Sequence, residues 1–337
     1  GEPIFIIAEI GDNHHGGYFM AKRCGEEAAK AGADAVKLQK RFITEVFAKE
    51  LIDRPQEKDQ IFGKTYGEYR RNLELDEDDL IKLKKLAESL GMIFFVTPFD
   101  KRSADFLESI DMDLYKIASF DMTNIPLLQH VAKKNKPMIL SVGMSTWDEI
   151  DEAVKTILQY NKQLMIKHCV SIYPTPDEKM NLATIAELKT RYAPLPIGYS
   201  GHEKDILPTL MAVALGALTV ERHFTLDNAL PGPDHSLSIE PQEFKEMVDA
   251  IRRIERLRGS ANIRLQEEEL RTRKKHGKSI VALKNIPAGT VITADMLTCK
   301  SPGYGLKPNM LEKVVGKKTN VDISEDTVIT EDSIIWN

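Results

Sequence analysis

The sequence predicts a (β/α)8 barrel followed by a small β-rich domain. Eight short apolar runs alternate with helix-like segments, and eight parallel strands are the number that closes such a barrel. Each run is nearly continuous in its apolar character, which is typical of strands covered on both faces. A doubly wound open sheet is the alternative. The sequence disfavours it because no GxGxxG motif follows the first apolar run.

The expected strands share a β-rich, apolar composition. They are FIIAEIG (5–11), DAVKLQK (34–40), GMIFFVTPF (91–99), DLYKIAS (113–119), KPMILSVG (136–143), LMIKHCV (164–170), LPIGYSG (195–201) and ALTVERHF (217–224). The segments between them are amphipathic and carry signals of helix ends. The segment 76–91 begins with acidic residues and ends at Gly91, and the segment 145–160 opens on Ser145 or Thr146 as its N-cap.

The alternation of strands and helices ends after a helix expected over 242–259. We therefore predict a catalytic barrel over 1–258, a charged linker over 259–276 and a small domain over 277–337. The small domain consists of short apolar runs broken by Pro-Ala-Gly, Ser-Pro-Gly and Gly-Lys-Lys turns. It is too small for a large core of its own, so we expect it to dock onto a barrel.

The composition excludes several classes of protein. The chain has 337 residues and a net charge of −5, with no apolar segment long enough to span a membrane and no basic stripe for nucleic acid. Its three cysteines form no CxxC pair, which suits a reducing cytoplasm. Glu2 and Pro3 lead straight into a strand-like run, unlike the basic and apolar order of a signal peptide. We therefore expect a cytoplasmic protein that binds neither nucleic acid nor membrane.

Polar residues gather at the C-terminal ends of the expected strands. In a (β/α)8 barrel these ends form the face that carries the chemistry. The residues there are Glu9, Lys37, Gln39, Thr97, Lys116, Ser119, Ser141, His168, Ser171, Ser200, His202, Glu221 and His223. This placement predicts an active site at one mouth of the barrel, with Glu221 and Arg222 as structural partners only.

Two lysines lie inside otherwise apolar strands. Lys37 and Lys116 each need an anionic partner, because a buried and unpaired ammonium is unfavourable. One interpretation pairs them with carboxylates on neighbouring strands. The other is an anionic substrate held by both lysines together with the hydroxyls of Thr97, Ser119 and Ser141. Two point charges plus neutral donors suit a small phosphorylated acid such as phosphoenolpyruvate.

Two histidines end the last two expected strands. His202 and His223 would therefore lie side by side at the same mouth. Two neutral imidazoles leave open coordination positions, as a catalytic divalent metal needs. The alternative is that each is a hydrogen-bonded structural residue. His14 and His15 could reach the same mouth, and His168 is either a packed strand residue or part of the site.

The ordered motifs resemble those of the sialic acid synthase family. They are AEIGDNHHGG, DAVKLQK, TPFD, YKIAS, LSVGMST, HCVSIYPTP, GYSGH, VERHFT and PGPDH. Members of that family condense phosphoenolpyruvate with an N-acetylhexosamine to make nonulosonic acids. The region from about 277 resembles the antifreeze-like (SAF, β-clip) domain of these enzymes, so the resemblance covers essentially the whole chain.

The resemblance implies a role for each matching position. It implies a divalent metal, Mn2+ or Mg2+, on His202 and His223, with Glu9 as an acidic residue near metal and substrate. The implied phosphoenolpyruvate-binding residues are Lys37, Thr97, Lys116, Ser119, Ser141 and Ser171. The implied sugar-binding residues are Gln39, Asp121, Tyr173 and Asp234. It also implies a homodimer in which the small domain of one chain caps the barrel of the other.

The chain departs from the family pattern at two positions. Ser171 stands where many bacterial members have asparagine. Ser301 stands where many have an arginine that reaches the sugar in the partner chain, so Lys300 or Lys307 substitutes for it or the acceptor is recognised differently. The acceptor is thus left open among N-acetylmannosamine, its 6-phosphate and a diacetamido-hexose. A related phosphoenolpyruvate-dependent 2-keto-3-deoxy acid synthase acting on another aldose or aldose phosphate is the alternative.

Overall fold

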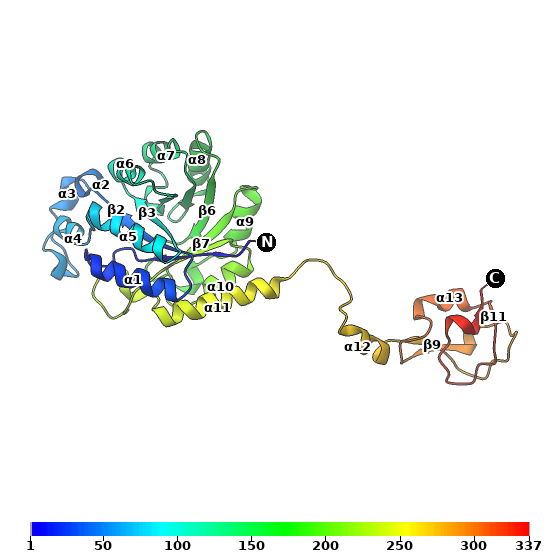
Figure 1. The fold of residues 1–337 in the computed structure, drawn as a ribbon. Coiled ribbons are helices and arrows are strands. Elements are labelled where there is room, and N and C mark those ends of the chain that lie inside the picture. The colour runs from blue at the N-terminus through cyan, green and yellow to red at the C-terminus, as the bar shows by residue number, and fades with distance from the viewer. Residues whose placement is uncertain (1, 337) are drawn as a thin grey trace. The chain divides into compact units, whose positions relative to one another are not determined.

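The first part of the chain is a closed barrel of eight parallel strands (Figure 1). The structure is a computed structural model in which residues 2–336 are described, and the chain divides into two compact units between Gly259 and Ser260. The strands follow one another around the barrel in chain order, and the last pairs with the first. The predicted (β/α)8 barrel with a small C-terminal domain is therefore confirmed.

Each barrel strand coincides with one of the eight apolar runs in the sequence. The strands are β1 (Phe5–Glu9), β2 (Ala35–Lys40), β3 (Ile93–Pro98), β4 (Tyr115–Ile117), β5 (Met138–Ser141), β6 (Leu164–Cys169), β7 (Ile197–Gly201) and β8 (Thr219–His223). The register between β1 and β8 pairs Glu9 with His223, and that between β1 and β2 pairs Glu9 with Lys37. The closing register thus sets three polar residues in one row at the C-terminal mouth.

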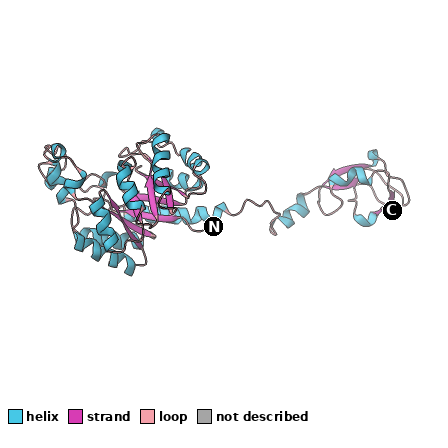
Figure 2. Cartoon of the chain, turned by 90° about the horizontal axis from the view of Figure 1, so that it is seen from above, coloured by secondary structure: helices cyan, strands magenta, loops and turns pink. Residues whose placement is uncertain are grey.

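Helices surround the strands and complete the apolar core (Figure 2). They are α1 (Tyr18–Lys30), α5 (Glu77–Ser89), α6 (Lys101–Ser109), α7 (Ile125–Ala132), α8 (Trp147–Leu158), α9 (Thr184–Arg191), α10 (Leu207–Ala214) and α11 (Pro241–Arg258). Local signals fix their ends. Asp76 caps α5, and Thr146 forms a capping box with Glu149 at the start of α8.

An insertion between β2 and α5 interrupts the regular alternation. It contains the short helices α2 (Ile43–Val46), α3 (Lys49–Ile52), η1 (Gln60–Phe62) and α4 (Tyr66–Asn72). α4 begins at a capping box between Thr65 and Glu68. It packs closely on α3, because a Cβ atom at Gly67 would lie 2.5 Å from Cγ2 of Ile52. The insertion brings Arg70 to the barrel mouth.

The second unit has its own small core. Its elements are α12 (Glu269–His276), β9 (Ser279–Ala282), η5 (Ala294–Met296), β10 (Leu297–Lys300), η6 (Pro308–Met310), α13 (Leu311–Val314), β11 (Lys318–Thr319), η7 (Glu331–Ser333) and β12 (Ile334–Ile335). β9 pairs antiparallel with β10, and β11 with β12. Ile280, Ile292 and Ile329 are fully buried between them. α12 falls within the segment 259–276. None of the helices within residues 2–336 is both long and apolar enough to cross a bilayer.

Candidate active site

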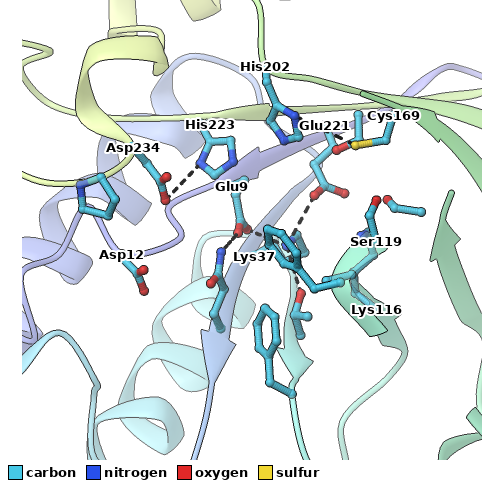
Figure 3. Close-up of a pocket in the computed structure, with 18 of the residues that line it drawn as sticks. Glu9, Asp12, Lys37, Lys116, Ser119, Cys169, His202, Glu221, His223 and Asp234 are labelled. Carbon is cyan, nitrogen blue, oxygen red and sulfur yellow. Dashed lines mark hydrogen bonds and ion pairs between the residues drawn. The ribbon is translucent and has the colours of Figure 1, made fainter. Parts of the chain in front are cut away.

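A cavity of about 300 Å³ opens at the C-terminal ends of the barrel strands (Figure 3). Eleven of the predicted site residues line it: Glu9, Lys37, Gln39, Thr97, Lys116, Ser119, Ser141, Tyr173, His202, His223 and Asp234. The other two lie beside it. Ser171 lines an adjoining cavity, and Asp121 accepts a hydrogen bond from Asn124. The remaining lining residues are Asp12, Arg41, Arg70, Phe99, Ala118, Phe120, Cys169, Ser200, Glu221 and Pro233.

Lys37 lies at the centre of a buried charge network. Its Nζ is 2.8 Å from Oε2 of Glu9 and 3.3 Å from Oε1 of Glu221, and it donates to Oγ1 of Thr97 at 3.0 Å. Burial opposes the charge on Lys37, but the two glutamates outweigh it and raise the pKa of Lys37 above its usual range. Lys37 therefore has the carboxylate partners of the structural interpretation and also lines the cavity.

Lys167 on β6 completes this network. Its Nζ is fully buried and donates to Oε2 of Glu221 at 2.7 Å. Glu221 thus bridges Lys167 and Lys37, which agrees with the structural role predicted for it. Lys167 was not among the residues predicted from the sequence. Like Lys37 and Lys116, it is a lysine inside an otherwise apolar strand, and this pattern could have identified it.

Lys116 differs from the other two buried lysines. Among residues 2–336, no carboxylate oxygen lies within 4.0 Å of its Nζ, which donates only to the carbonyl of Ile117 at 3.1 Å. Burial lowers the pKa of Lys116 to about 8. Glu221 favours the charge on Lys116 only from beyond 4.0 Å, so this buried cation is suited to an anionic ligand.

Hydroxyl groups surround the same end of the cavity. Oγ of Ser141 and Oγ of Ser171 are buried without a hydrogen-bond partner, and Oγ of Ser119 accepts from the amide of Gly143 at 2.9 Å. A Cβ atom at Gly143 would lie 2.6 Å from Oγ of Ser171 and 2.9 Å from Oγ of Ser119. The absence of a side chain at Gly143 thus leaves room for both serine hydroxyls.

The two predicted metal ligands lie on neighbouring strand ends. The ring centroids of His202 and His223 are 5.5 Å apart. Nδ1 of His202 donates to the carbonyl of Val170 at 2.7 Å, which leaves Nε2 available as a ligand. Burial lowers the pKa of His223 to about 4, so its imidazole is neutral, and its buried Nδ1 lacks a hydrogen-bond partner. Nδ1 of His223 also lies 3.7 Å from Oδ2 of Asp234.

These donors fit a divalent metal. Two imidazoles with carboxylates nearby offer the nitrogen and oxygen donors that divalent transition metals such as Mn2+ accept in proteins. Across residues 2–336, no group of three or more His, Cys, Asp or Glu side chains is placed to hold a metal ion. His202 and His223 are thus two candidate ligands for a metal, and two protein ligands leave coordination positions for substrate and water.

A second buried ion pair fixes the position of these histidines. Arg222 directly precedes His223, and its Nη1 lies 3.0 Å from Oε1 of Glu203. Glu203 directly follows His202 and also accepts from the hydroxyls of Tyr199 and Thr209. This contact, predicted as structural for Arg222, ties the end of β7 to β8.

The remaining mouth histidines have partners outside the cavity. His14 is buried, and its Nδ1 accepts from the amide of Gly16 at 3.0 Å. Nε2 of His15 lies 2.7 Å from Nε2 of His235. His168 donates to the carbonyl of Met180 at 2.7 Å. His168 is therefore a packed strand residue, the first of the two interpretations that the sequence allowed.

Comparison with known proteins identifies the chain. A model of the NeuB family matches residues 26–263, which is more than half of the chain. The chain belongs to the NeuB family. A model of the SAF domain matches residues 277–335. The resemblance inferred from the ordered motifs is thus confirmed, for the barrel and for the small domain.

Several relatives of this NeuB chain are named as synthases. N-acetylneuraminate-9-phosphate synthase of Homo sapiens is 40% identical over 98% of this chain and 93% of its own length. N,N'-diacetyllegionaminic acid synthase of Legionella pneumophila is 36% identical over 96% of this chain and 93% of its own. The structure of an N-acetylneuraminic acid synthetase from Leptospira borgpetersenii is similar, with a TM-score of 0.70 and 34% identity, over 80% of this chain and 90% of that one.

We predict that Lys167→Met destabilises this NeuB barrel by about 3 kcal/mol, because it leaves the buried carboxylate of Glu221 with one partner fewer. The measurement is the free energy of unfolding from urea denaturation. The double variant K167M/E221Q should regain part of the loss, since it removes the excess charge. Lys155→Met, at an exposed position on α8, is the control. Equal stability of K167M and K155M would contradict the prediction.

Proposed function

We propose that this chain is a nonulosonic acid synthase that condenses phosphoenolpyruvate with an open-chain N-acetylated hexose and releases phosphate. The observation that carries the proposal is Lys116, a buried ammonium without a carboxylate partner among residues 2–336. Ser141, whose buried hydroxyl has no hydrogen-bond partner, lines the same cavity, and the partnerless hydroxyl of Ser171 lies in the adjoining one. Such a site matches the several negatively charged oxygens of phosphoenolpyruvate.

In this proposal the lysines bind and orient phosphoenolpyruvate. Lys116 takes its negative charge directly, and Lys37 adds a second cation that Glu9 and Glu221 hold in position. The hydroxyls of Ser119 and Ser141 donate to its oxygens. These contacts would hold C3 of phosphoenolpyruvate with one face toward the acceptor. The reaction then no longer depends on a chance encounter in the right orientation, which lowers its barrier.

The acceptor would lie between the histidines and the loop after β8. Asp234, Tyr173 and Gln39 line this part of the cavity and offer hydrogen bonds to sugar hydroxyls. A divalent metal held by His202 and His223 would supply Lewis-acid polarisation of the aldehyde oxygen. The carbon–carbon bond forms between C3 of phosphoenolpyruvate and the aldehyde carbon. Water then adds at C2, and loss of phosphate gives the 2-keto acid.

Glu9 is the candidate for orienting that water. Its Oε1 accepts from Nε2 of Gln39 at 2.7 Å, and its Oε2 faces Lys37. Its Cα partner in the sheet is His223, so the carboxylate lies next to the proposed metal. We propose in addition that the enzyme is a cytoplasmic homodimer in which the small domain of one chain caps the barrel of the other. The resemblance of the sequence supports this arrangement.

Phosphate release from phosphoenolpyruvate tests the function. We expect release in the presence of Mn2+ and one of three acceptors: N-acetylmannosamine, its 6-phosphate or a diacetamido-hexose. Mass spectrometry of the product should show a nine-carbon 2-keto acid. Arabinose 5-phosphate and erythrose 4-phosphate serve as the rival acceptors. Release with these aldose phosphates alone would favour the 2-keto-3-deoxy acid synthase and contradict the proposal.

A further inference from the structure

Two arginines line the cavity and have no role in the function proposed above. Arg41 follows β2, and Arg70 comes from α4 in the insertion. Both contact the same carboxylate. Oδ1 of Asp12 lies 3.4 Å from Nη1 of Arg41, and Oδ2 of Asp12 lies 2.8 Å from Nη1 of Arg70. One buried aspartate thus holds two guanidinium groups side by side at the cavity wall.

Arg70 keeps part of its hydrogen-bonding capacity free. Nη1 donates to Asp12, whereas Nε is buried without a partner. Within residues 2–336 its side chain makes no other hydrogen bond, so the edge formed by Nε and Nη2 is unused. This edge of a guanidinium is a planar fork that matches two oxygens of an oxyanion. The side chain is largely buried and rests against the rings of Tyr66 and Tyr69.

Arg41 is fixed more completely. Its Nη1 donates to Oε1 of Glu74 at 3.0 Å, its Nη2 donates to Gln39, and its guanidinium lies 4.0 Å from the ring centroid of Phe99. Glu74 does not line the cavity. Arg41 therefore brings a rigid positive charge to the wall beside the free fork of Arg70.

We propose that Arg70, together with Arg41, binds a phosphate monoester on the acceptor sugar, so that the acceptor is a phosphorylated N-acetylhexosamine. This inference rests on the proposed function and deepens it. A phosphate monoester is dianionic and has three terminal oxygens, so it can meet two guanidiniums at once. A sugar hydroxyl or an acetamido group offers one uncharged oxygen, which leaves one of the two free donors of Arg70 without a partner.

Another carboxylate lies in the same cavity. Asp234 is 3.7 Å from Nδ1 of His223. Burial raises the pKa of Asp234, and the charges of Arg70 and Arg41 also act on it, against that rise. The rival explanation is structural: Arg70 would only attach the insertion to the barrel through Asp12. In that case a change at Arg70 would affect all acceptors to the same degree. Selectivity between acceptors, rather than activity alone, therefore distinguishes the two explanations.

The test compares acceptors in variants of the full chain. kcat/KM is measured by phosphate release from phosphoenolpyruvate, with N-acetylmannosamine 6-phosphate, N-acetylmannosamine and N-acetylmannosaminuronate. We expect the wild type to prefer the 6-phosphate. Arg70→Gln should reduce that preference about 30-fold, as expected for the loss of a charge-assisted bidentate contact. Arg70→Lys, which keeps the charge but not the fork, should fall between. The matched control is Arg71→Gln, because Arg71 is exposed and next along α4.

Several outcomes would overturn the inference. They are equal preferences in R70Q and R71Q, a wild type that prefers the unphosphorylated sugar, and a preference for the uronate. Thermal unfolding of each variant shows whether R70Q is folded. If no acceptor supports the release of phosphate, the proposed function is wrong. The inference about Arg70 is then tested separately, by calorimetric measurement of the binding of N-acetylmannosamine 6-phosphate. Weaker binding by R70Q than by R71Q supports it, and equal binding overturns it.

Discussion

Lys116→Met is expected to raise KM for phosphoenolpyruvate by roughly 100-fold or more, because truncating one partner of a buried charge pair typically costs about 2–5 kcal/mol of binding. The same change should leave the stability of the free enzyme unchanged or higher. Among residues 2–336, Lys116 has no carboxylate within 4.0 Å to lose, and burial outweighs the more distant charge of Glu221, as the lowering of its pKa to about 8 shows. Initial-rate kinetics and urea denaturation measure the two effects.

The combination of weaker binding and retained stability is what makes this prediction specific. Lys101 starts α6 at an exposed position, so Lys101→Met is the control and should change neither quantity. A large loss of stability in K116M would show that Lys116 has a structural partner in solution. An unchanged KM would remove the main support for phosphoenolpyruvate at this end of the cavity.

The sequence offers no distinction between Lys37 and Lys116, whereas in the structure only Lys37 has carboxylate partners within 4.0 Å among residues 2–336. Both lie in apolar strands, and both interpretations applied equally to each. The difference comes from register: β1 pairs Glu9 with Lys37, and Glu221 on β8 reaches Lys37 and Lys167. The position of a residue within its strand predicts at which end of the barrel the residue lies. It does not predict which residues meet across a closed barrel, because that depends on the register of every pair.

The insertion escaped prediction for a related reason. Its helices are short and follow neither the strand period nor a long amphipathic helix period, so residues 41–75 carry no clear pattern. Arg70 then contacts Asp12 across 58 positions of sequence. By contrast, the ends of β7 and β8 fix His202 and His223 once the strands are ordered, and the sequence placed both at the same mouth.

His223→Ala is expected to lower kcat by roughly 1,000-fold or more, since Lewis-acid polarisation of the aldehyde contributes several kcal/mol to such reactions. His202→Ala should have an effect of similar size. Both variants should also bind Mn2+ more weakly in calorimetry with the free protein, a readout that does not depend on turnover. His202→Ala also removes the hydrogen bond to the carbonyl of Val170, so thermal unfolding of both variants shows whether they are folded.

His276→Ala is the matched control, because His276 is exposed at the end of α12. EDTA treatment should abolish turnover by the wild type and the control, and added Mn2+ should restore it. Full activity after EDTA would exclude the proposed metal. If H223A loses activity but binds Mn2+ with unchanged affinity, we would conclude that other side chains bind the metal. Glu9 and Asp234 flank His223, so Glu9→Gln and Asp234→Asn would then identify them.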